Sequence, residues 1–429
     1  MKRENVLLIG NGGREHALAW GISKSHRLGQ LFIANGNPGT GRCGTNVDLD
    51  VTEFSAVNKF IIENDISLTV IGPEQPLVDG ITDYLMERNH KVFGPSASAA
   101  QLEGSKSFAK AMMEKYDIPT AAYKRFTFEE KEAAEEYIND SRSWPIVLKA
   151  NGLAGGKGVF ICEDAKDAIH RFRFMTEDDS MKASGSLIIE EFMEGEEASV
   201  FAVTDGKQVK ILLPAQDHKR IGDGDTGLNT GGMGAYAPAP LMDKALLSQV
   251  EREVIYPILE GMVKEGMPYR GVLYVGLMMT EGGPKVVEFN CRFGDPECQV
   301  LIPGLKSDLL ELLLATVNNK LEETDIQLSD DYFCCVVMAS KGYPETYEKN
   351  KFISGLGDVS DDVIVFHSGT KESDDGIYTD GGRVLSVVGS GNSLEQAISK
   401  TYREIKKINF ENAYYRTDIG KKGLALKHQ

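Results

Sequence analysis

Lys149-Ala150-Asn151-Gly152-Leu153-Ala154-Gly155-Gly156-Lys157-Gly158-Val159 is the densest glycine run in the chain, and it follows an apolar strand predicted at residues 146–148. Two lysines bracket the loop, so its backbone N–H groups and the ammonium of Lys149 suit a polyphosphate. The run is not a P-loop, because that motif requires glycine at position 151 and Ser or Thr at position 158. We therefore expect a nucleotide triphosphate beneath a glycine lid, with a flexible hairpin as the less favoured alternative.

Two segments downstream of this loop can complete a nucleotide site. The first is the acid run at residues 190–197, which interrupts apolar strands. Acid runs are usually solvated faces, but an acid between buried strands can accept the adenine amino group or the ribose hydroxyls. The second is Lys285–Asn290, where strand alternation places Glu288 and Asn290 on one face. Two oxygen ligands at that spacing can hold Mg²⁺ against phosphates.

The N-terminal glycine cluster is Gly10-Asn11-Gly12-Gly13-Arg14-Glu15-His16-Ala17, between a predicted strand and a predicted helix. This context suits anion binding at a helix N-terminus, and a tight strand–helix turn is the alternative. A dinucleotide is disfavoured, because Glu15 replaces the third glycine of that fingerprint and no acid follows the second strand. Similar turns at residues 35–40 and 72–77 also follow strands. Open α/β sheets bind ligands at such ends, so the three turns together favour a small phosphorylated polar molecule.

Short apolar strands alternate with helices over residues 1–100, which predicts a parallel sheet covered on both faces. The expected strands are 6–9, 31–33, 68–71 and 91–93, and the expected helices are 14–24, 54–64 and 77–88. A helix at 105–116, strands at 146–148, 187–189 and 199–202, a hairpin at 271–290 and a helix at 309–318 follow. Beyond a polar stretch at 322–331, strands at 333–338, 363–367 and 383–388 and a helix at 393–408 predict a small α+β domain.

The composition narrows the range of partners. The chain has 429 residues, of which 64 are acidic and 47 basic, for a net charge of -17. Such a field repels phosphate backbones and anionic lipids, so we expect neither nucleic acid nor membrane as a partner. The six cysteines form no C-x-x-C pair, which favours reduced, buried thiols. With no signal or spanning segment in the sequence, we expect a cytoplasmic protein. We also expect a monomer, with a weak oligomer as the alternative.

These segments resemble the ATP-grasp superfamily and, within it, the phosphoribosylamine–glycine ligase family of purine biosynthesis. The match covers essentially the whole chain and is carried by residues 10–17, 101–106, 216–220, 229–236 and 288–299. Its most diagnostic string is Arg292-Phe293-Gly294-Asp295-Pro296-Glu297, followed by Gln299. The resemblance implies a Rossmann-like, substrate-binding pre-ATP-grasp domain at 1–103, an ATP-grasp domain with two subdomains at 104–325, and a C-terminal α+β domain at 326–429.

The resemblance also implies roles for individual residues. ATP would be bound by Lys106, Lys149, Gly155, Gly156, Lys157, Gly158, Glu190, Glu191, Phe192 and Glu197, and Mg²⁺ or Mn²⁺ by Glu288 and Asn290. Phosphoribosylamine and glycine would be bound by Asn11, Gly12, Gly13, Arg14, Asn37, Gly39, Thr40, Glu74, Asp217, Arg292 and Asp295. Catalysis would rest on Arg292, Lys149, Asp217 and Lys219.

Several of these assignments have an alternative. Glu196 competes with Glu197 for the ribose, Arg292 can instead form a structural ion pair with Asp295 or Glu297, and His218 can be a structural histidine. The preceding strand at 272–280 has no acid to share the metal, so few protein ligands are expected. The glycine-rich segments at 152–158 and 222–234 are expected to be lids.

The implied reaction joins glycine to 5-phosphoribosylamine and forms glycinamide ribonucleotide, ADP and phosphate. A carboxylate is a poor acylating agent, so the γ-phosphoryl group would first convert glycine into an acyl phosphate, which the sugar amine then attacks. Two alternatives stay open at this point. One is a related ATP-grasp ligase with another acceptor, such as a carboxylase-like enzyme acting on a purine intermediate. The other is a nucleotide sensor without catalysis, which would have no use for Glu288, Asn290 and the turn at 292–297.

Overall fold

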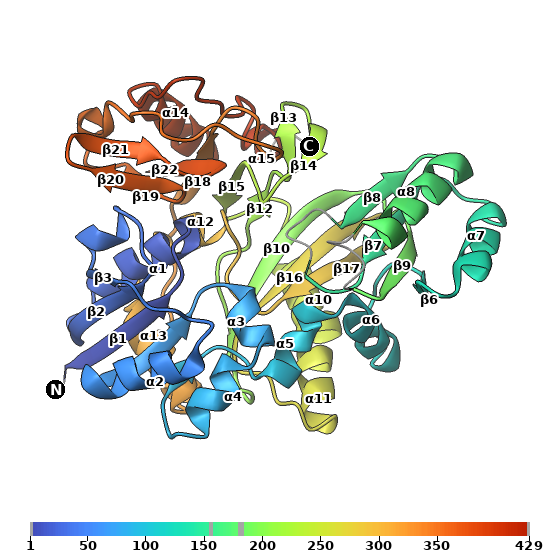
Figure 1. The fold of residues 1–429 in the computed structure, drawn as a ribbon, viewed down its shortest axis with the longest axis horizontal. Coiled ribbons are helices and arrows are strands. Elements are labelled where there is room, and N and C mark those ends of the chain that lie inside the picture. Colours follow the sequence, from blue (N-terminus) through green and yellow to red (C-terminus); the bar gives the residue numbers. More distant parts are fainter. Residues whose placement is uncertain (1–2, 154–157, 179–183, 427–429) are drawn as a thin grey trace.

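The computed structural model describes residues 3–153, 158–178 and 184–426. Figure 1 shows an N-terminal domain in blue, a C-terminal part in orange and red beside it, and a central part in green and yellow on the other side. Sheets of four and five strands dominate all three parts. The expected N-terminal parallel sheet and C-terminal α+β part are confirmed, and the central part between them contains two four-stranded sheets.

The N-terminal sheet has the order β3-β2-β1-β4-β5, and all of its strand pairs are parallel. Its strands are β1 (Glu4–Ile9), β2 (Leu28–Ala34), β3 (Thr45–Val47), β4 (Ile66–Ile71) and β5 (Val92–Phe93). The helices are α1 (Gly13–Ser23), α2 (Phe54–Glu63), α3 (Glu74–Val78) and α4 (Ile81–Met86). The single helix expected at 77–88 is therefore wrong. The chain breaks at Gly80, which has the left-handed φ of 92° that glycine tolerates best.

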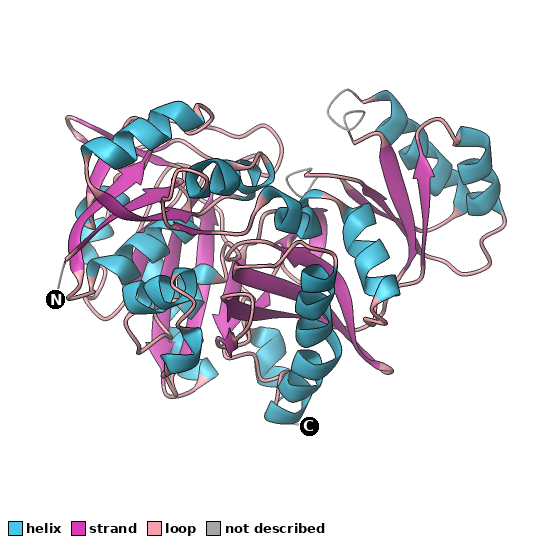
Figure 2. Ribbon diagram, turned by 90° about the horizontal axis from the view of Figure 1, so that it is seen from below, coloured by secondary structure: helices cyan, strands magenta, loops and turns pink. Residues whose placement is uncertain are grey.

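The first central sheet is antiparallel, with the order β6-β9-β7-β8. Its elements are β6 (Tyr123–Thr127), α7 (Lys131–Asn139), β7 (Ile146–Ala150), β8 (Val159–Cys162), α8 (Ala165–Glu177) and β9 (Ser186–Glu191). Helices α7 and α8 cover one face and share a separate hydrophobic core with it. Figure 2 shows this lobe standing apart from the rest of the molecule. Helices α5 (Ala97–Gly104) and α6 (Lys106–Lys115) connect it to the N-terminal domain.

The second central sheet has the order β11-β10-β16-β17. Its strands are β10 (Glu196–Thr204), β11 (Val209–Ile211), β16 (Gly271–Thr280) and β17 (Gly283–Asn290). The predicted hairpin is confirmed, with Gly283 opposite Thr280 and a bulge beside Gly276 that faces Glu288. Helices α10 (Lys244–Val250) and α11 (Tyr256–Lys264) belong to this part, joined by a π-helical turn (Glu251–Ile255), and α12 (Cys298–Leu301) and α13 (Leu309–Val317) follow β17.

The C-terminal sheet combines strands from two distant parts of the chain. Its order is β12-β15-β18-β22-β19, with β12 (Gln216–Asp217), β15 (Gly234–Ala237), β18 (Tyr332–Ala339), β19 (Ile364–His367) and β22 (Arg383–Gly391). Two small hairpins, β13 (Arg220–Gly222) with β14 (Thr226–Asn229) and β20 (Thr370–Ser373) with β21 (Gly376–Thr379), and helices α14 (Leu394–Ile405) and α15 (Lys421–Leu426) complete this part. This sheet therefore contains strands from both sides of the domain boundary expected between residues 325 and 326. The expected domain bounds stay a proposal.

Burial follows these layers. One core joins the N-terminal domain to the central and C-terminal parts through Leu18, Phe201, Leu313 and Phe366 among others. All six cysteines are free thiols, as expected, and only Cys43 is partly exposed. Within the described residues no helix is long and apolar enough to cross a membrane.

Candidate active site

Three lysines surround one buried carboxylate between the two central sheets. Glu190, near the end of β9, pairs with Lys149 on β7 at 2.8 Å and with Lys110 on α6 at 3.3 Å. Lys149 also donates to the carbonyl of Val287 on β17 at 3.3 Å, so it spans the gap between the sheets. Burial lowers the pKa of Lys106, although Glu288 opposes this shift. Positive charge is therefore concentrated where the sequence predicts phosphate binding.

The glycine loop begins beside these lysines. Lys106 donates to the carbonyl of Gly152 at 2.8 Å. The side chain of Asn151 accepts hydrogen bonds from the Ser107 N–H at 3.0 Å and from the Ser105 hydroxyl at 3.3 Å, which fastens the loop to α6. Gly158 lies just before β8 and accepts a hydrogen bond from the Ala150 N–H. The predicted contacts Gly155, Gly156 and Lys157 lie outside the described residues.

Of the three residues predicted to bind adenine, only Glu190 is buried. Glu190 is 3% exposed, whereas Glu191, the last residue of β9, and Phe192 after it are exposed. Glu191 accepts a hydrogen bond from the Ala122 N–H at 3.1 Å and pairs with Lys285 at 3.3 Å. These contacts leave the backbone of the 190–192 segment at the junction of the two sheets, which is where the resemblance places the base.

A second cluster of charge centres on Lys219, which follows β12. Its ammonium pairs with Glu197 on β10 and lies 3.6 Å from Asp217. Burial opposes the charge of Lys219, but Asp217 and Glu197 outweigh it and raise its pKa well above the ordinary value. Glu197, expected to bind the ribose, is thus engaged with a candidate catalytic residue.

Glu297 adds a second buried acid to this cluster. It is 4% exposed and lies 3.5 Å from the hydroxyl of Ser199, which in turn donates to Tyr274. Burial and the neighbouring Asp217 raise the pKa of Glu297 to about 7. Burial also raises the pKa of Asp217. The two acids therefore compete for ionisation, and Lys219 is the cation that stabilises a carboxylate here.

Glu288 and Asn290 lie together at the end of β17, as the alternation predicts. The Asn290 amide lies 3.4 Å from the Glu288 carboxylate. Burial opposes ionisation of Glu288, but Lys219, Lys149 and Lys106 outweigh it and lower its pKa. An ionised carboxylate beside an amide oxygen is a donor set that fits a hard divalent cation. Their position among the lysines that face the phosphate side matches the expected metal site.

Arg292 forms a buried ion-pair network with partners other than the expected ones. Its guanidinium lies 2.7 Å from Glu103 and 3.1 Å from Glu74. The alternative of a pair with Asp295 or Glu297 is therefore wrong. The reason is that α3 and α5 present Glu74 and Glu103 from the N-terminal side, a contact across more than 180 residues that local sequence does not show.

A cavity of about 590 Å³ opens between the N-terminal domain and the C-terminal part. It is lined by Asn11, Gly12, Gly36, Asn37, Pro38, Asn46, Asp295, Ser368, Gly369, Thr370, Lys371, Glu372, Asp380 and Arg383. Asn11, Gly12, Asn37 and Asp295 are thus brought together as expected. Gly13, Arg14, Gly39 and Thr40 are not among the lining residues.

The four predicted residues that do not line the cavity support its wall. Thr40 is buried and donates to the carbonyl of Asn37 at 2.8 Å, and Gly39 packs against His16. Arg14 pairs with Glu15 at 2.6 Å, and its backbone N–H donates to Asp295 at 3.3 Å. These residues shape the turns that carry Asn11 and Asn37.

Four charged residues at these sites have no role in the sequence interpretation. Lys110 follows Lys106 by one helical turn on α6, so helical spacing gave a signal for it. Glu103 lies on α5 and was considered only as part of the segment 101–106. Glu297 was considered only as an ion-pair partner. Arg383 pairs with Asp295 at 3.2 Å from a strand 88 residues further on, and nothing in the local pattern indicated it.

The segment at 222–234, expected to be a lid, forms part of a small hairpin, and its role as a lid stays a prediction. This segment contains strand β14 and part of β15, and its loop is tied to the C-terminal segment through Asp223, Gly224 and Asp225. Gly231 also accepts a hydrogen bond from Arg383 at 2.6 Å. Glycine at position 231 permits this close approach of the Arg383 guanidinium.

Comparison with known proteins agrees with this geometry. Three family models match: the N domain of phosphoribosylglycinamide synthetase at residues 4–103, its ATP-grasp (A) domain at 104–298 and its C domain at 333–422. The phosphoribosylamine–glycine ligase of Rhodopirellula baltica is 46% identical over 99% of this chain and 99% of its own length. The crystal structure of the phosphoribosylamine–glycine ligase of Thermotoga maritima matches with a TM-score of 0.84 and 34% identity, over 97% of this chain and 100% of that one.

A more distant structure shares the fold. The biotin carboxylase domain of the Hydrogenobacter thermophilus 2-oxoglutarate carboxylase, solved with MgADP and bicarbonate, matches with a TM-score of 0.73 and 15% identity, over 97% of this chain and 92% of that one. The fold and the matching ATP-grasp domain define an ATP-grasp ligase. The chain belongs to the phosphoribosylglycinamide synthetase family, which confirms the resemblance and the expected class of enzyme.

Proposed function

We propose that this chain ligates glycine to 5-phosphoribosylamine with ATP, through a glycyl phosphate formed at the junction of the two central sheets. The observation that carries this proposal is the meeting of two charged groups there. Glu288 lies close enough to Lys149 and Lys106 of the first group, and to Lys219 of the second, for all three charges to lower its pKa. A donor of phosphoryl groups and a carboxylate acceptor can therefore be held next to one another.

In this proposal the lysines bind and orient the nucleotide. Lys106 and Lys149 neutralise the phosphates, the loop at 152–158 covers them, and the segment at 190–192 receives the adenine. Glu288 and Asn290 would hold Mg²⁺ or Mn²⁺, which supplies charge neutralisation to the phosphates when bound. Most of the rate enhancement expected for such a transfer comes from positioning and fixed charge, which the buried lysines provide.

Glycine is assigned to the cluster around Lys219. Asp217 accepts hydrogen bonds from the glycine ammonium, and the ammonium of Lys219, joined to both Asp217 and Glu197, orients the glycine carboxylate. Arg292 stabilises the acyl phosphate and the phosphate that leaves. Its two carboxylate partners, Glu74 and Glu103, keep this cation in a fixed place.

Phosphoribosylamine is assigned to the cavity between the N-terminal domain and the C-terminal part. The exposed Asn11 offers an amide donor there, whereas the N–H groups of Gly12 and Asn37 are bonded within the protein and shape the wall. Arg383 and Lys371 bring positive charge for the phosphate. Arg14 and Glu74 stand between this cavity and Arg292, with 3.9 Å between Arg14 and Glu74. This arrangement directs the sugar amine towards the acyl carbon, where it replaces phosphate.

The decisive experiment is glycine-dependent release of ADP with phosphoribosylamine as the acceptor. We expect ADP and glycinamide ribonucleotide in equal amounts, and no ADP when bicarbonate replaces glycine. ADP release that follows bicarbonate and ignores glycine would assign the chain to a carboxylase-like reaction. ATP binding without any turnover would make it a sensor.

A further inference from the structure

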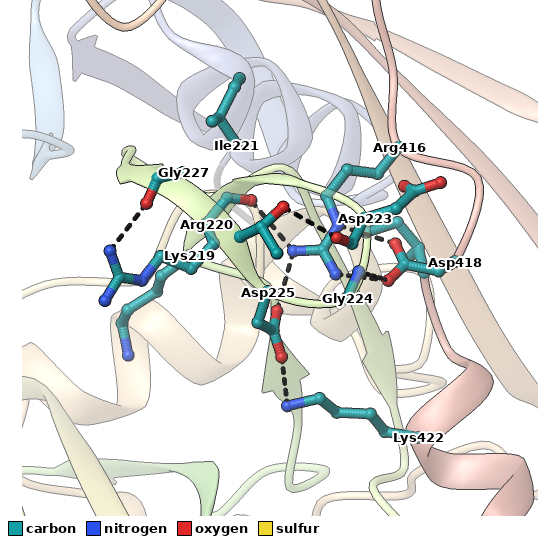
Figure 3. A network of polar contacts seen from close by, with 12 residues as sticks. Lys219, Arg220, Ile221, Asp223, Gly224, Asp225, Gly227, Arg416, Asp418 and Lys422 are labelled. Atoms are coloured by element: carbon teal, nitrogen blue, oxygen red, sulfur yellow. Dashed lines mark hydrogen bonds and ion pairs between the residues drawn. The ribbon is translucent and has the colours of Figure 1, made fainter.

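The C-terminal segment holds the hairpin that directly follows Asp217 and Lys219. We name its five contact residues the C-terminal clamp: Tyr414, Arg416, Thr417, Asp418 and Lys422. All of them meet the β13–β14 hairpin or its loop, almost 200 residues earlier in the chain. Figure 3 shows the guanidinium of Arg416 between Asp225 and Asp418, with Lys422 reaching the other face of Asp225.

Arg416 is the centre of this clamp, and its side chain is fully buried. Its Nε and Nη2 donate to the two oxygens of Asp418, each at 2.7 Å. Its Nη1 donates to Asp225 at 2.9 Å and to the carbonyl of Arg220 at 3.0 Å. A buried guanidinium needs such partners, because an unpaired buried charge costs free energy. The carbonyl of Arg220, one peptide bond beyond Lys219, is thereby fixed.

The remaining clamp residues hold the hairpin at other points. The hydroxyl of Tyr414 donates to the carbonyl of Ile221 at 2.8 Å. The backbone N–H of Thr417 donates to Asp223 at 2.8 Å, and the Gly224 N–H donates to Asp418 at 2.8 Å. Both strand β13 and the tip of the loop are therefore tied to the C-terminal segment.

The clamp also reaches the strand that carries Glu197. Lys422 lies 2.5 Å from Asp225 and 3.1 Å from Glu196, the residue before Glu197. The surroundings of Lys219 are thus held at three points. The hydroxyl of Thr230 donates to the carbonyl of Lys219 at 2.8 Å, and Arg416 donates to the carbonyl of the next residue, Arg220. Lys422 pairs with Glu196 on β10, the strand that carries Glu197. Lysine has a long and flexible side chain, so its place depends on where its backbone and its partner are held.

We propose that Arg416 is a positioning residue for catalysis: it acts through Lys219, which it holds in register with Asp217 and Glu197. This inference rests on the proposed assignment of Lys219 to the reaction centre. The guanidinium of Arg416 contacts Arg220, Asp225 and Asp418, and none of these three residues is assigned to the ATP or phosphoribosylamine site. Loss of Arg416 should therefore reduce kcat and leave the KM for ATP unchanged.

The test is a double-mutant cycle on the full-length enzyme, with R416Q and K219Q separately and together. Residues that act as a unit give non-additive losses. We expect R416Q to lower kcat roughly tenfold in the native background and less than about twofold in the K219Q background. D225N is the second variant, because Asp225 is partly exposed and its loss leaves the Arg416–Asp418 pair intact.

The matched control is E404Q. Glu404 is a buried acid on α14 in the same C-terminal part, and its side-chain partners, Lys407, Arg403 and the Ser360 N–H, are not residues of the clamp. It should lower the melting temperature without lowering kcat. D225N carries the test alone if R416Q does not fold.

Each outcome decides between the two proposals. The positioning role is overturned if R416Q lowers kcat by the same factor in the native and the K219Q backgrounds. It is also overturned if kcat is unchanged in both R416Q and D225N. If R416Q and D225N keep the native kcat while K219Q is inactive, only the positioning role of Arg416 fails, and the proposed function stands. If K219Q turns over normally, the assignment of Lys219 in the proposed function fails, and the inference fails with it.

Discussion

Lys149 and Glu190 form an ion pair of 2.8 Å between neighbouring antiparallel strands, at the junction of the two central sheets. Glu190 also pairs with Lys110, so two cations share one carboxylate. With Lys106 counted, three lysines lie near the two carboxylates Glu190 and Glu288, so this side of the site carries an excess of positive charge. A polyphosphate restores neutrality, whereas a neutral ligand would leave a buried excess of cations, which costs free energy.

Replacing Lys149 by Met should abolish product formation and leave the fold intact. The substitution keeps most of the volume but removes a fixed charge, and loss of one such group lowers kcat by about 100-fold or more. Glycine-dependent ADP release measures the effect, and circular dichroism checks the fold. Lys124→Met, on the exposed side of β6, is the control. Normal turnover of Lys149→Met would show that the phosphate site lies elsewhere.

Replacing Glu288 by Gln should raise the concentration of Mg²⁺ needed for half-maximal activity. The variant keeps an amide oxygen but loses the ionised carboxylate, and we expect a shift of roughly tenfold or more. A titration with Mg²⁺ at saturating ATP measures it. Glu281→Gln, in the exposed turn between β16 and β17, should leave the titration unchanged. An unaltered metal requirement in Glu288→Gln would remove this residue from the metal site.

Replacing Arg383 by Ala should raise the KM for phosphoribosylamine roughly 10- to 100-fold, because a charge-assisted contact to phosphate is lost. The KM for ATP should stay the same, since Arg383 lines only the cavity near the N-terminal domain. Arg403→Ala, in the same C-terminal part, is the control. If both KM values rise together, Arg383 acts on the whole fold and the cavity is not the sugar-phosphate site.

Three buried histidines should make the protein sensitive to acid. Burial lowers the pKa of His16 to about 3 and the pKa values of His218 and His367 to about 4. They stay neutral in the folded chain, whereas the unfolded chain takes up protons near its ordinary pKa of about 6.5. Stability is therefore fully present above that pH and is lost as the pH falls towards the folded values, by up to about 1.4 kcal/mol per pH unit for each histidine.

The histidine effect can be measured with His16→Gln. Glutamine keeps an acceptor for the His367 N–H, which donates to His16 at 2.7 Å, but does not titrate. Urea unfolding between pH 4 and 7 should show a shallower loss of stability than in the native chain. His170→Gln, on the exposed face of α8, is the control. An identical slope for His16→Gln would mean that His16 is not held neutral.

The fold was predictable where a pattern is local. The apolar strands of the N-terminal sheet and the hairpin at 271–290 are confirmed because strand alternation and turn residues act over a few positions. The helix expected at 77–88 failed at Gly80, since an apolar pattern continued through a break in backbone conformation. Helices α7 and α8, with charged outer faces, carried too weak a signal to be named.

The site was predictable where residues of one motif act together, as with Glu288 and Asn290. It was not predictable where a charged residue pairs with a residue from a distant part of the chain. Arg292 pairs with Glu103 across 189 positions, and Asp295 with Arg383 across 88. Such pairs depend on how the three parts of the chain pack together, and the spacing of residues along the sequence does not show this packing. The expected monomer and the cytoplasmic location likewise stay predictions.

The sheet that joins β12 and β15 to β18 has a consequence for how the chain can be divided. Ala235 pairs with Cys335 and Tyr236 with Cys334 in the middle of that sheet, on either side of the polar stretch at 322–331. A protease that cuts within this stretch should leave two fragments bound to each other, because hydrogen bonds and buried side chains hold them after the covalent link is gone. Expressing the part before the cut alone would expose a bare strand edge next to Asp217, and such an edge promotes aggregation.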